Sequence, residues 1–161
     1  MLFRSSIVTR AAGILDVDLD EEGAAEIARR SRGTPRIGNR LLRQVRDFAQ
    51  VERSGVVDGP VARDGLAFFG VDDLGLDKPS REILSVLCRR FDGGPVGLKT
   101  LSISVSESED TVEDVYEPYL IQQGLLHRTP KGRVATTAAY DHLGINRPAV
   151  PERRAGSLFE D

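Results

Sequence analysis

Residues 29–47 decide how the first half of the chain folds, and they read RRSRGTPRIGNRLLRQVRD. Gly33 suits the left-handed backbone position that follows a helix end. Thr34 can cap the next helix, and Pro35 fits its first turn because that position needs no backbone N–H donor. The stretch therefore predicts one helix that ends, a tight turn, and a second helix that starts at Pro35.

The second helix has one apolar face and one basic face at helical spacing. The apolar positions are Ile37, Leu41, Val45, Phe48 and Ala49, and the basic positions are Arg36, Arg40 and Arg43. Arg36 lies in the first turn, where the helix dipole and free backbone N–H groups favour negative charge. A bound anion would explain a cation there, so the pattern predicts a phosphate site at Arg36. The alternative interpretation is an ordinary solvated helix face.

The composition limits the class of protein. The chain has 161 residues, of which 40% are hydrophobic and 29% charged, as in a globular protein. Its net charge of −3 restricts any nucleic-acid surface to a local patch. No apolar run approaches the roughly 20 residues that span a bilayer, and the first residues do not read as a secretory signal. The single cysteine, Cys88, excludes an internal disulfide framework, which suits the reducing cytoplasm. We expect its thiol to be buried in the fold.

Hydrophobic periodicity predicts four helices in the first half, over residues 1–15, 21–31, 35–53 and 60–69. Asp20 is the expected cap of the second of these helices. The helical pattern breaks over residues 71–79, which end in Pro79. We therefore expect a small helical domain over residues 1–72 and a second domain from residue 73.

The second half begins with an expected helix over residues 80–91, followed by a glycine-rich turn over residues 92–97. This turn lacks the Lys-Ser/Thr pair of a phosphate loop, so a tight connection is the better interpretation. Short helices are expected over residues 99–105 and from Thr111 to Gly124, and Pro118 should interrupt the second. Two short helices joined by a turn and followed by strands are typical of a helix-turn-helix protein.

Strands are expected over residues 125–128 and 133–136, joined by the turn Thr129-Pro130-Lys131-Gly132. The hairpin carries Arg128, Lys131 and Arg133, with no carboxylate in the same stretch. The two arginines lie opposite each other or diagonally, depending on a bulge at Gly132. Like charges this close cost stability, whereas a phosphate backbone would neutralise them. The pattern predicts a winged helix over residues 73–145 with a last helix at 137–143, and a disordered tail over residues 146–161.

The sequence offers no catalytic or metal site. His127 and His142 are far apart and have no partner at metal or triad spacing. HExxH, GxSxG, zinc-cluster and Walker A patterns do not occur in the 161 residues. We expect neither a catalytic residue nor a metal ligand here.

Four motifs resemble the RuvB family, the bacterial hexameric ATPases of the AAA+ class that drive branch migration of Holliday junctions. They are RRSRGTPRI at 29–37, GGPVGL at 93–98, TVEDVYEPYLIQQG at 111–124 and RTPKGR at 128–133. The resemblance covers nearly all of residues 5–145. It implies a mostly α fold, in which a small helical AAA+ lid is followed by a winged helix with a β-hairpin wing.

The resemblance also implies partners and site residues. Arg36, preceded by Pro35, would sense ATP or ADP from the lid. Arg128, Lys131 and Arg133 would contact the backbone of double-stranded DNA in the junction arms. The nucleotide-binding domain, with Walker A, Walker B, the arginine finger and the surface for RuvA, would precede residue 1 in a homo-hexameric protein. This chain alone is therefore expected not to hydrolyse ATP.

The sequence departs from the family pattern at Gly38, where the family commonly has alanine, and at the acidic turn of Glu109 and Asp110. Its negative charge puts in doubt a base or phosphate contact from that turn. The leading hypothesis is the C-terminal part of the motor. The alternatives are a stand-alone winged-helix DNA-binding regulator with a helical dimerisation domain, and an adaptor whose arginine helix binds an acidic partner.

Overall fold

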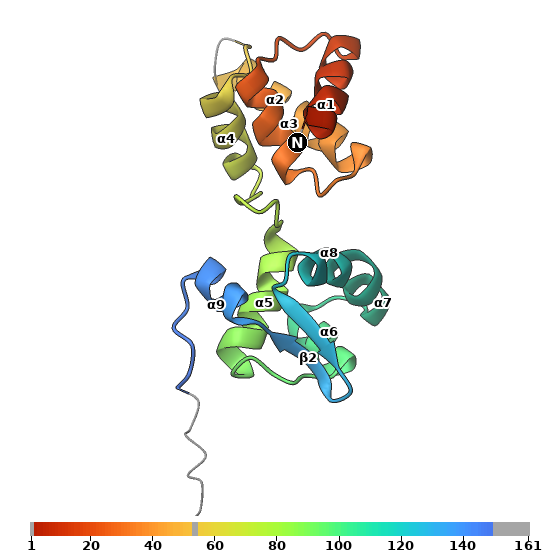
Figure 1. The fold of residues 1–161 in the computed structure, drawn as a ribbon, viewed down its shortest axis with the longest axis vertical. Coiled ribbons are helices and arrows are strands. Elements are labelled where there is room, and N and C mark those ends of the chain that lie inside the picture. Colours follow the sequence, from red (N-terminus) through yellow and green to blue (C-terminus); the bar gives the residue numbers. More distant parts are fainter. Residues whose placement is uncertain (1, 53–54, 150–161) are drawn as a thin grey trace, which may run out of the picture. The chain divides into compact units, whose positions relative to one another are not determined.

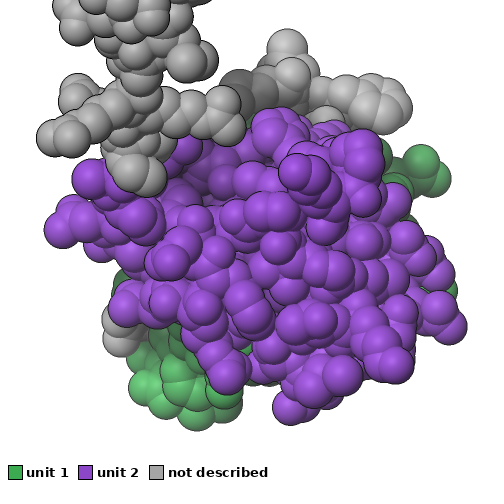
Figure 2. Space-filling view, turned by 90° about the horizontal axis from the view of Figure 1, so that it is seen from below, with its two compact units in different colours: residues 1–82 green, residues 83–161 purple. Residues whose placement is uncertain are grey.

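The computed structural model describes residues 2–52 and 55–149. It divides into two compact units, residues 1–82 and 83–161, which Figure 2 colours separately. The elements of the first unit are α1 (Leu2–Ile14), α2 (Glu21–Arg30), α3 (Pro35–Glu52), α4 (Gly59–Phe68) and the start of α5 (Lys78–Arg90) (Figure 1). The second unit contains the rest of α5, α6 (Leu98–Val105), α7 (Glu109–Thr111), the π-helix η1 (Val112–Tyr116), α8 (Glu117–Gln122), β1 (Leu126–Thr129), β2 (Gly132–Ala135) and α9 (Thr137–Leu143).

The first unit is a helical bundle around one apolar core. As predicted, Asp20 caps α2, and its Oδ1 accepts a hydrogen bond from the Gly23 N–H at 2.7 Å. The apolar face of α3 is buried, and the core residues are Val8, Ala12, Ile27, Ala28, Leu41, Leu42, Val45, Ala49, Val57, Val61, Ala62, Leu66 and Val71. This packing confirms the helical periodicity in the sequence.

The second unit packs its helices against a small antiparallel sheet. β1 and β2 pair with Arg128 directly opposite Arg133. On the other edge of β2, Val96 exchanges backbone hydrogen bonds with Arg133 at 2.9 and 2.7 Å. The glycine-rich turn therefore adds an isolated β-bridge at Val96 to the two-stranded sheet, a role that the sequence did not reveal. Three helices with such a hairpin confirm the predicted mostly α fold with a winged helix.

Two predicted helix starts are wrong. α5 begins at Lys78 rather than Ser80, because Pro79 fits a first turn and the Asp77 carboxylate caps the helix through the Ser80 N–H at 3.1 Å. The helix before the wing begins at Glu109 rather than Thr111, because the Ser108 hydroxyl is the cap. The acidic residues Glu109 and Asp110 thus occupy a first helical turn, which the helix dipole favours.

The predicted interruption of this helix by Pro118 is confirmed. The π-helix η1 ends at Tyr116, and α8 begins at the next residue, Glu117, with Pro118 in its first turn. Proline has no N–H to donate, so the regular hydrogen-bond pattern cannot run through it. The predicted disordered tail falls mainly on residues 150–161, which lie outside the described residues.

Candidate functional site

The turn between α2 and α3 has the predicted geometry. Gly33 has a φ of 72°, and Arg32 before it has a φ of 53°, so two successive residues are left-handed. The Thr34 hydroxyl accepts a hydrogen bond from the Ile37 N–H at 3.3 Å, and Pro35 is the first residue of α3. Arg36 follows in the first helical turn with its side chain exposed.

The outer face of α3 is an open polar groove. It is lined by Arg36, Asn39, Arg40, Arg43, Gln44 and Asp47. Arg36, Arg40 and Arg43 form no ion pair or hydrogen bond with any residue that the structure describes. The predicted anion site at Arg36 is thus a cluster of cations without carboxylate partners, one turn apart along a helix.

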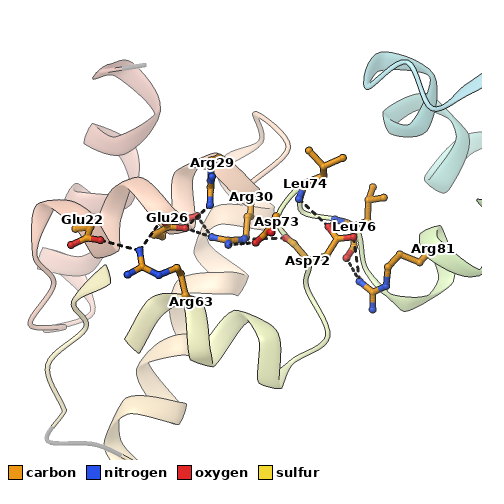
Figure 3. Close-up of polar contacts among 10 residues, drawn as sticks. All are labelled: Glu22, Glu26, Arg29, Arg30, Arg63, Asp72, Asp73, Leu74, Leu76 and Arg81. Carbon is orange, nitrogen blue, oxygen red and sulfur yellow. Dashed lines mark hydrogen bonds and ion pairs between the residues drawn. The ribbon is translucent and has the colours of Figure 1, made fainter. Parts of the chain in front are cut away.

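Arg30, at the end of α2, is in the opposite situation, since only 3% of its side chain is exposed. Figure 3 shows its polar contacts. Its Nε donates to the Asp72 carbonyl and its Nη2 to the Asp73 carboxylate, both at 3.0 Å. It also forms an ion pair with Glu26. Burial alone would raise the pKa of Glu26, but the hydrogen bond and charge of Arg30, together with Arg29 and Arg63, lower it. Arg30 thus ties α2 to the segment that follows α4.

Arg32 and Arg81 hold the same segment, residues 70–77. The Arg32 Nε donates to the Gly75 carbonyl at 3.0 Å, and its Nη2 lies 3.5 Å from the Asp77 carboxylate. The Arg81 Nη1 donates to the Gly70 and Leu76 carbonyls at 2.8 and 2.6 Å. These contacts explain why the first compact unit extends to residue 82. The sequence showed only a break in periodicity here, although its arginines and aspartates were a usable signal.

The hairpin places Arg128 and Arg133 on one face. Because the Arg133 N–H and C=O both bond to Val96, the Arg128–Arg133 pair is not hydrogen-bonded across the strands. Cα atoms in such pairs are only about 4.5 Å apart, and their side chains are close. The strand register therefore brings the two guanidinium groups close together. This is the directly opposite arrangement, one of the two that the sequence left open.

The hairpin contains no carboxylate of its own, but a helix that precedes it in the chain supplies one to both arginines. Glu117, at the start of α8, accepts from the Arg133 Nε at 2.6 Å and from the Arg128 Nε at 2.7 Å. Glu113, in η1, lies 3.3 Å from the Arg133 Nη2. The hydrogen bond that Arg133 donates to Glu117 raises the pKa of Arg133 above its usual value. The acids come from a helix earlier in the chain, which a reading of the hairpin alone could not reveal.

The three basic residues of the hairpin differ in what they can still bind. Arg128 keeps 44% of its side chain exposed, whereas Arg133 keeps only 14%. Lys131, in the turn, is exposed and forms no ion pair with any described residue. Lys131 and the outer edge of Arg128 are therefore the groups best placed to meet an anion.

Metal binding and thiol catalysis have little support in the part of the chain that the structure describes. No group of three or more His, Cys, Asp and Glu side chains there could hold a metal ion. Cys88 is buried as predicted, and burial raises the pKa of its thiol. A thiol with a raised pKa is a poor nucleophile.

Two family models match successive parts of the chain. Residues 4–72 match the RuvB AAA lid domain, and residues 73–144 match the RuvB C-terminal winged helix domain. The chain belongs to the RuvB family.

Relatives and solved structures agree with this assignment. The Holliday junction branch migration complex subunit RuvB of a Nocardioides species is 58% identical over 158 residues, covering 96% of this chain and 44% of that protein. The subunit from Oleidesulfovibrio alaskensis is 60% identical over 139 residues, covering 86% and 43%. The structure of the Thermotoga maritima RuvB Holliday junction branch migration motor matches with a TM-score of 0.85 at 42% identity, covering 89% of this chain and 48% of that one.

The chain spans less than half the length of these RuvB proteins. In RuvB terms, the α2–α3 turn with Pro35 and Arg36 belongs to the lid, and the Arg128–Arg133 hairpin belongs to the winged helix. Among the described helices, none is both long enough and apolar enough to cross a membrane.

Proposed function

We propose that this chain supplies the lid and the duplex-binding winged helix of an ATP-driven RuvB motor that promotes branch migration of Holliday junctions. The observation that carries the proposal is the hairpin, where an exposed lysine with no ion-pair partner among the described residues stands beside two closely spaced arginines. Family membership supports it, because the relatives are named for this activity. The functional parts are residues 1–72 and 73–145.

In this proposal the wing binds DNA through its phosphates. Lys131 and the exposed edge of Arg128 make the first contacts, and Arg133 adds its charge from a more buried position. Contacts to phosphate carry no sequence information, because every base pair presents the same backbone. This suits a motor that must move along any sequence.

The lid would sense ATP or ADP through Arg36, held in place by Pro35. Support comes from the exposed arginines of the α3 groove, which lack partners among the described residues, and from the position of Arg36 at the positive end of the helix dipole. The turn before Arg36 is bonded through Arg32 to residues 75–77, which lead into α5. A nucleotide-driven shift of that turn would therefore pull directly on the start of α5.

The remaining partners follow from the family. The whole protein would be a homo-hexamer in the cytoplasm, and RuvA would dock on parts outside this chain. Alone, this chain would bind DNA weakly and would not hydrolyse ATP.

The proposal is tested by titrating the chain against two duplexes of unrelated sequence at two salt concentrations. We expect equal affinities for the two duplexes and a steep loss of affinity at the higher salt. Lys131→Ala should weaken binding roughly fivefold and lower the salt slope by about one. His127→Ala, which removes an exposed neighbour on the same hairpin, is the control. Strong preference for one duplex would instead favour a sequence-specific regulator, and no binding at low salt would refute the DNA part.

The nucleotide part has its own test. Inorganic triphosphate added to ¹⁵N-labelled chain should shift the amide resonances of residues 36–38, because the anion binds at the first turn of α3. Arg36→Ala should remove most of this shift, whereas Arg46→Ala, which deletes an arginine already paired with Asp47, should keep it. Equal shifts in both variants would argue against a sensor at Arg36.

A further inference from the structure

Glu117 is the one acidic side chain classed as fully buried among the residues whose burial is described, with 0% exposed. It lies at the start of α8, directly after the π-helix η1. A buried carboxylate costs several kcal/mol unless it is paired and hydrogen-bonded. Its environment therefore has to supply strong donors, and the hairpin arginines Arg128 and Arg133 supply them.

Both carboxylate oxygens of Glu117 are used. Oε1 accepts from the Arg133 Nε at 2.6 Å, and Oε2 accepts from the Arg128 Nε at 2.7 Å and lies 2.6 Å from its Nη2. One carboxylate thus bridges the two arginines that the strand register sets side by side. Without it, these like charges would repel across the strands.

A two-stranded hairpin has little stability of its own, so its orientation depends on what anchors it. Backbone bonds to Val96 anchor one edge, at Arg133. Glu117 anchors the side chains of both strands to α8. We propose that Glu117 is a positioning residue for DNA binding, which clamps the wing so that Lys131 and the exposed edge of Arg128 meet adjacent phosphates. This inference rests on the proposed function of the wing.

The proposal predicts an effect opposite in sign to simple electrostatics. Removing a negative charge beside a DNA-binding surface should strengthen binding to phosphate if the charge acts only through its field. If Glu117 acts by positioning, its removal should weaken binding although the net charge becomes more positive. Glu113 provides a matched control, because it contacts the same arginines at 3.3 and 3.9 Å while 41% of its side chain is exposed.

The experiment compares duplex affinity of the full chain with that of Glu117→Gln and Glu113→Gln at low salt. We expect Glu117→Gln to weaken binding about tenfold, which corresponds to about 1.4 kcal/mol. Glu113→Gln should leave the affinity unchanged or tighten it. If Glu117→Gln binds as tightly as wild type or more tightly, the inference is overturned, while wild-type binding leaves the proposed function standing. If the wild-type chain does not bind, the proposed function fails and the inference fails with it.

Loss of folding is separated from loss of positioning by a spectroscopic signature. In Glu117→Gln, the side-chain Nε–H resonances of Arg128 and Arg133 should lose their protection from solvent exchange, while the Leu120 amide stays protected. If Glu117→Gln unfolds the second unit, Glu117→Asp replaces it, because the shorter side chain keeps the charge and reaches one arginine only. Weakened binding by a folded Glu117→Asp supports the clamp, and unweakened binding overturns it.

Discussion

Replacing Arg30 by alanine is expected to lower the free energy of unfolding of the first unit by about 3 kcal/mol. The side chain is only 3% exposed, and it donates to the Asp72 carbonyl, the Asp73 carboxylate and Glu26. Removing Arg30 leaves the Asp72 carbonyl without this donor and takes from Glu26 its buried partner. The loss falls at the lower end for such pairs because Glu26 keeps Arg63, at 3.2 Å.

The measurement is urea unfolding followed by two probes. Circular dichroism reports both units, whereas all three tyrosines, Tyr116, Tyr119 and Tyr140, lie in the second unit. Arg30→Ala should shift the dichroism transition and leave the tyrosine-fluorescence transition in place. Arg29→Ala is the control, because Arg29 also pairs with Glu26 but is 48% exposed, and should cost less than about 1 kcal/mol. Equal losses in the two variants would show that the buried network does not stabilise the bundle.

Replacing Gly132 by alanine should destabilise the second unit by about 3 kcal/mol, through both strain and a clash. Gly132 has a φ of 134°, a backbone angle that residues with a side chain rarely adopt. A Cβ there would lie 2.5 Å from the Val96 carbonyl carbon and oxygen. Backbone atoms cannot move aside as a flexible side chain would. The bridge residue Val96 would have to separate from β2, and the wing would lose that anchor.

Gly124→Ala separates strain from clash. Gly124 also has a positive φ, 69°, but a Cβ added there would meet nothing within 4 Å. This variant should cost only about 1 kcal/mol, the penalty for a left-handed non-glycine residue. Tyrosine fluorescence during urea unfolding measures both. If Gly132→Ala is as stable as Gly124→Ala, the close approach of Val96 to the hairpin is not a constraint on the fold.

Local features of this chain could be predicted from its sequence because each depends on neighbouring residues. The Asp20 cap, the left-handed Gly33 and the interruption near Pro118 all follow from short-range backbone chemistry. The wrong helix start at Ser80 arose because Pro79 was taken as a break, although proline also suits a first turn.

Contacts between distant residues could not be predicted in this way. Nothing near Arg30 in the sequence indicates a bond to Asp72, which lies 42 positions later. In the same way, Glu117 precedes Arg133 by 16 positions. The sequence of the hairpin therefore shows positive charges without a nearby carboxylate, and only the fold brings Glu117 of α8 beside them. The spacing of Glu113 and Glu117 was a possible signal, since residues four apart lie on one helix face.

The central claim is that the hairpin around Lys131 binds the phosphate backbone of duplex DNA. The most direct measurement adds an unlabelled duplex to the ¹⁵N-labelled chain at low salt and follows the amide resonances. The account predicts that the largest shifts fall on residues 126–135 and on the start of α8, are the same for a second unrelated duplex, and fade as salt is added. Shifts confined to the α3 groove, with the hairpin unaffected, would contradict it.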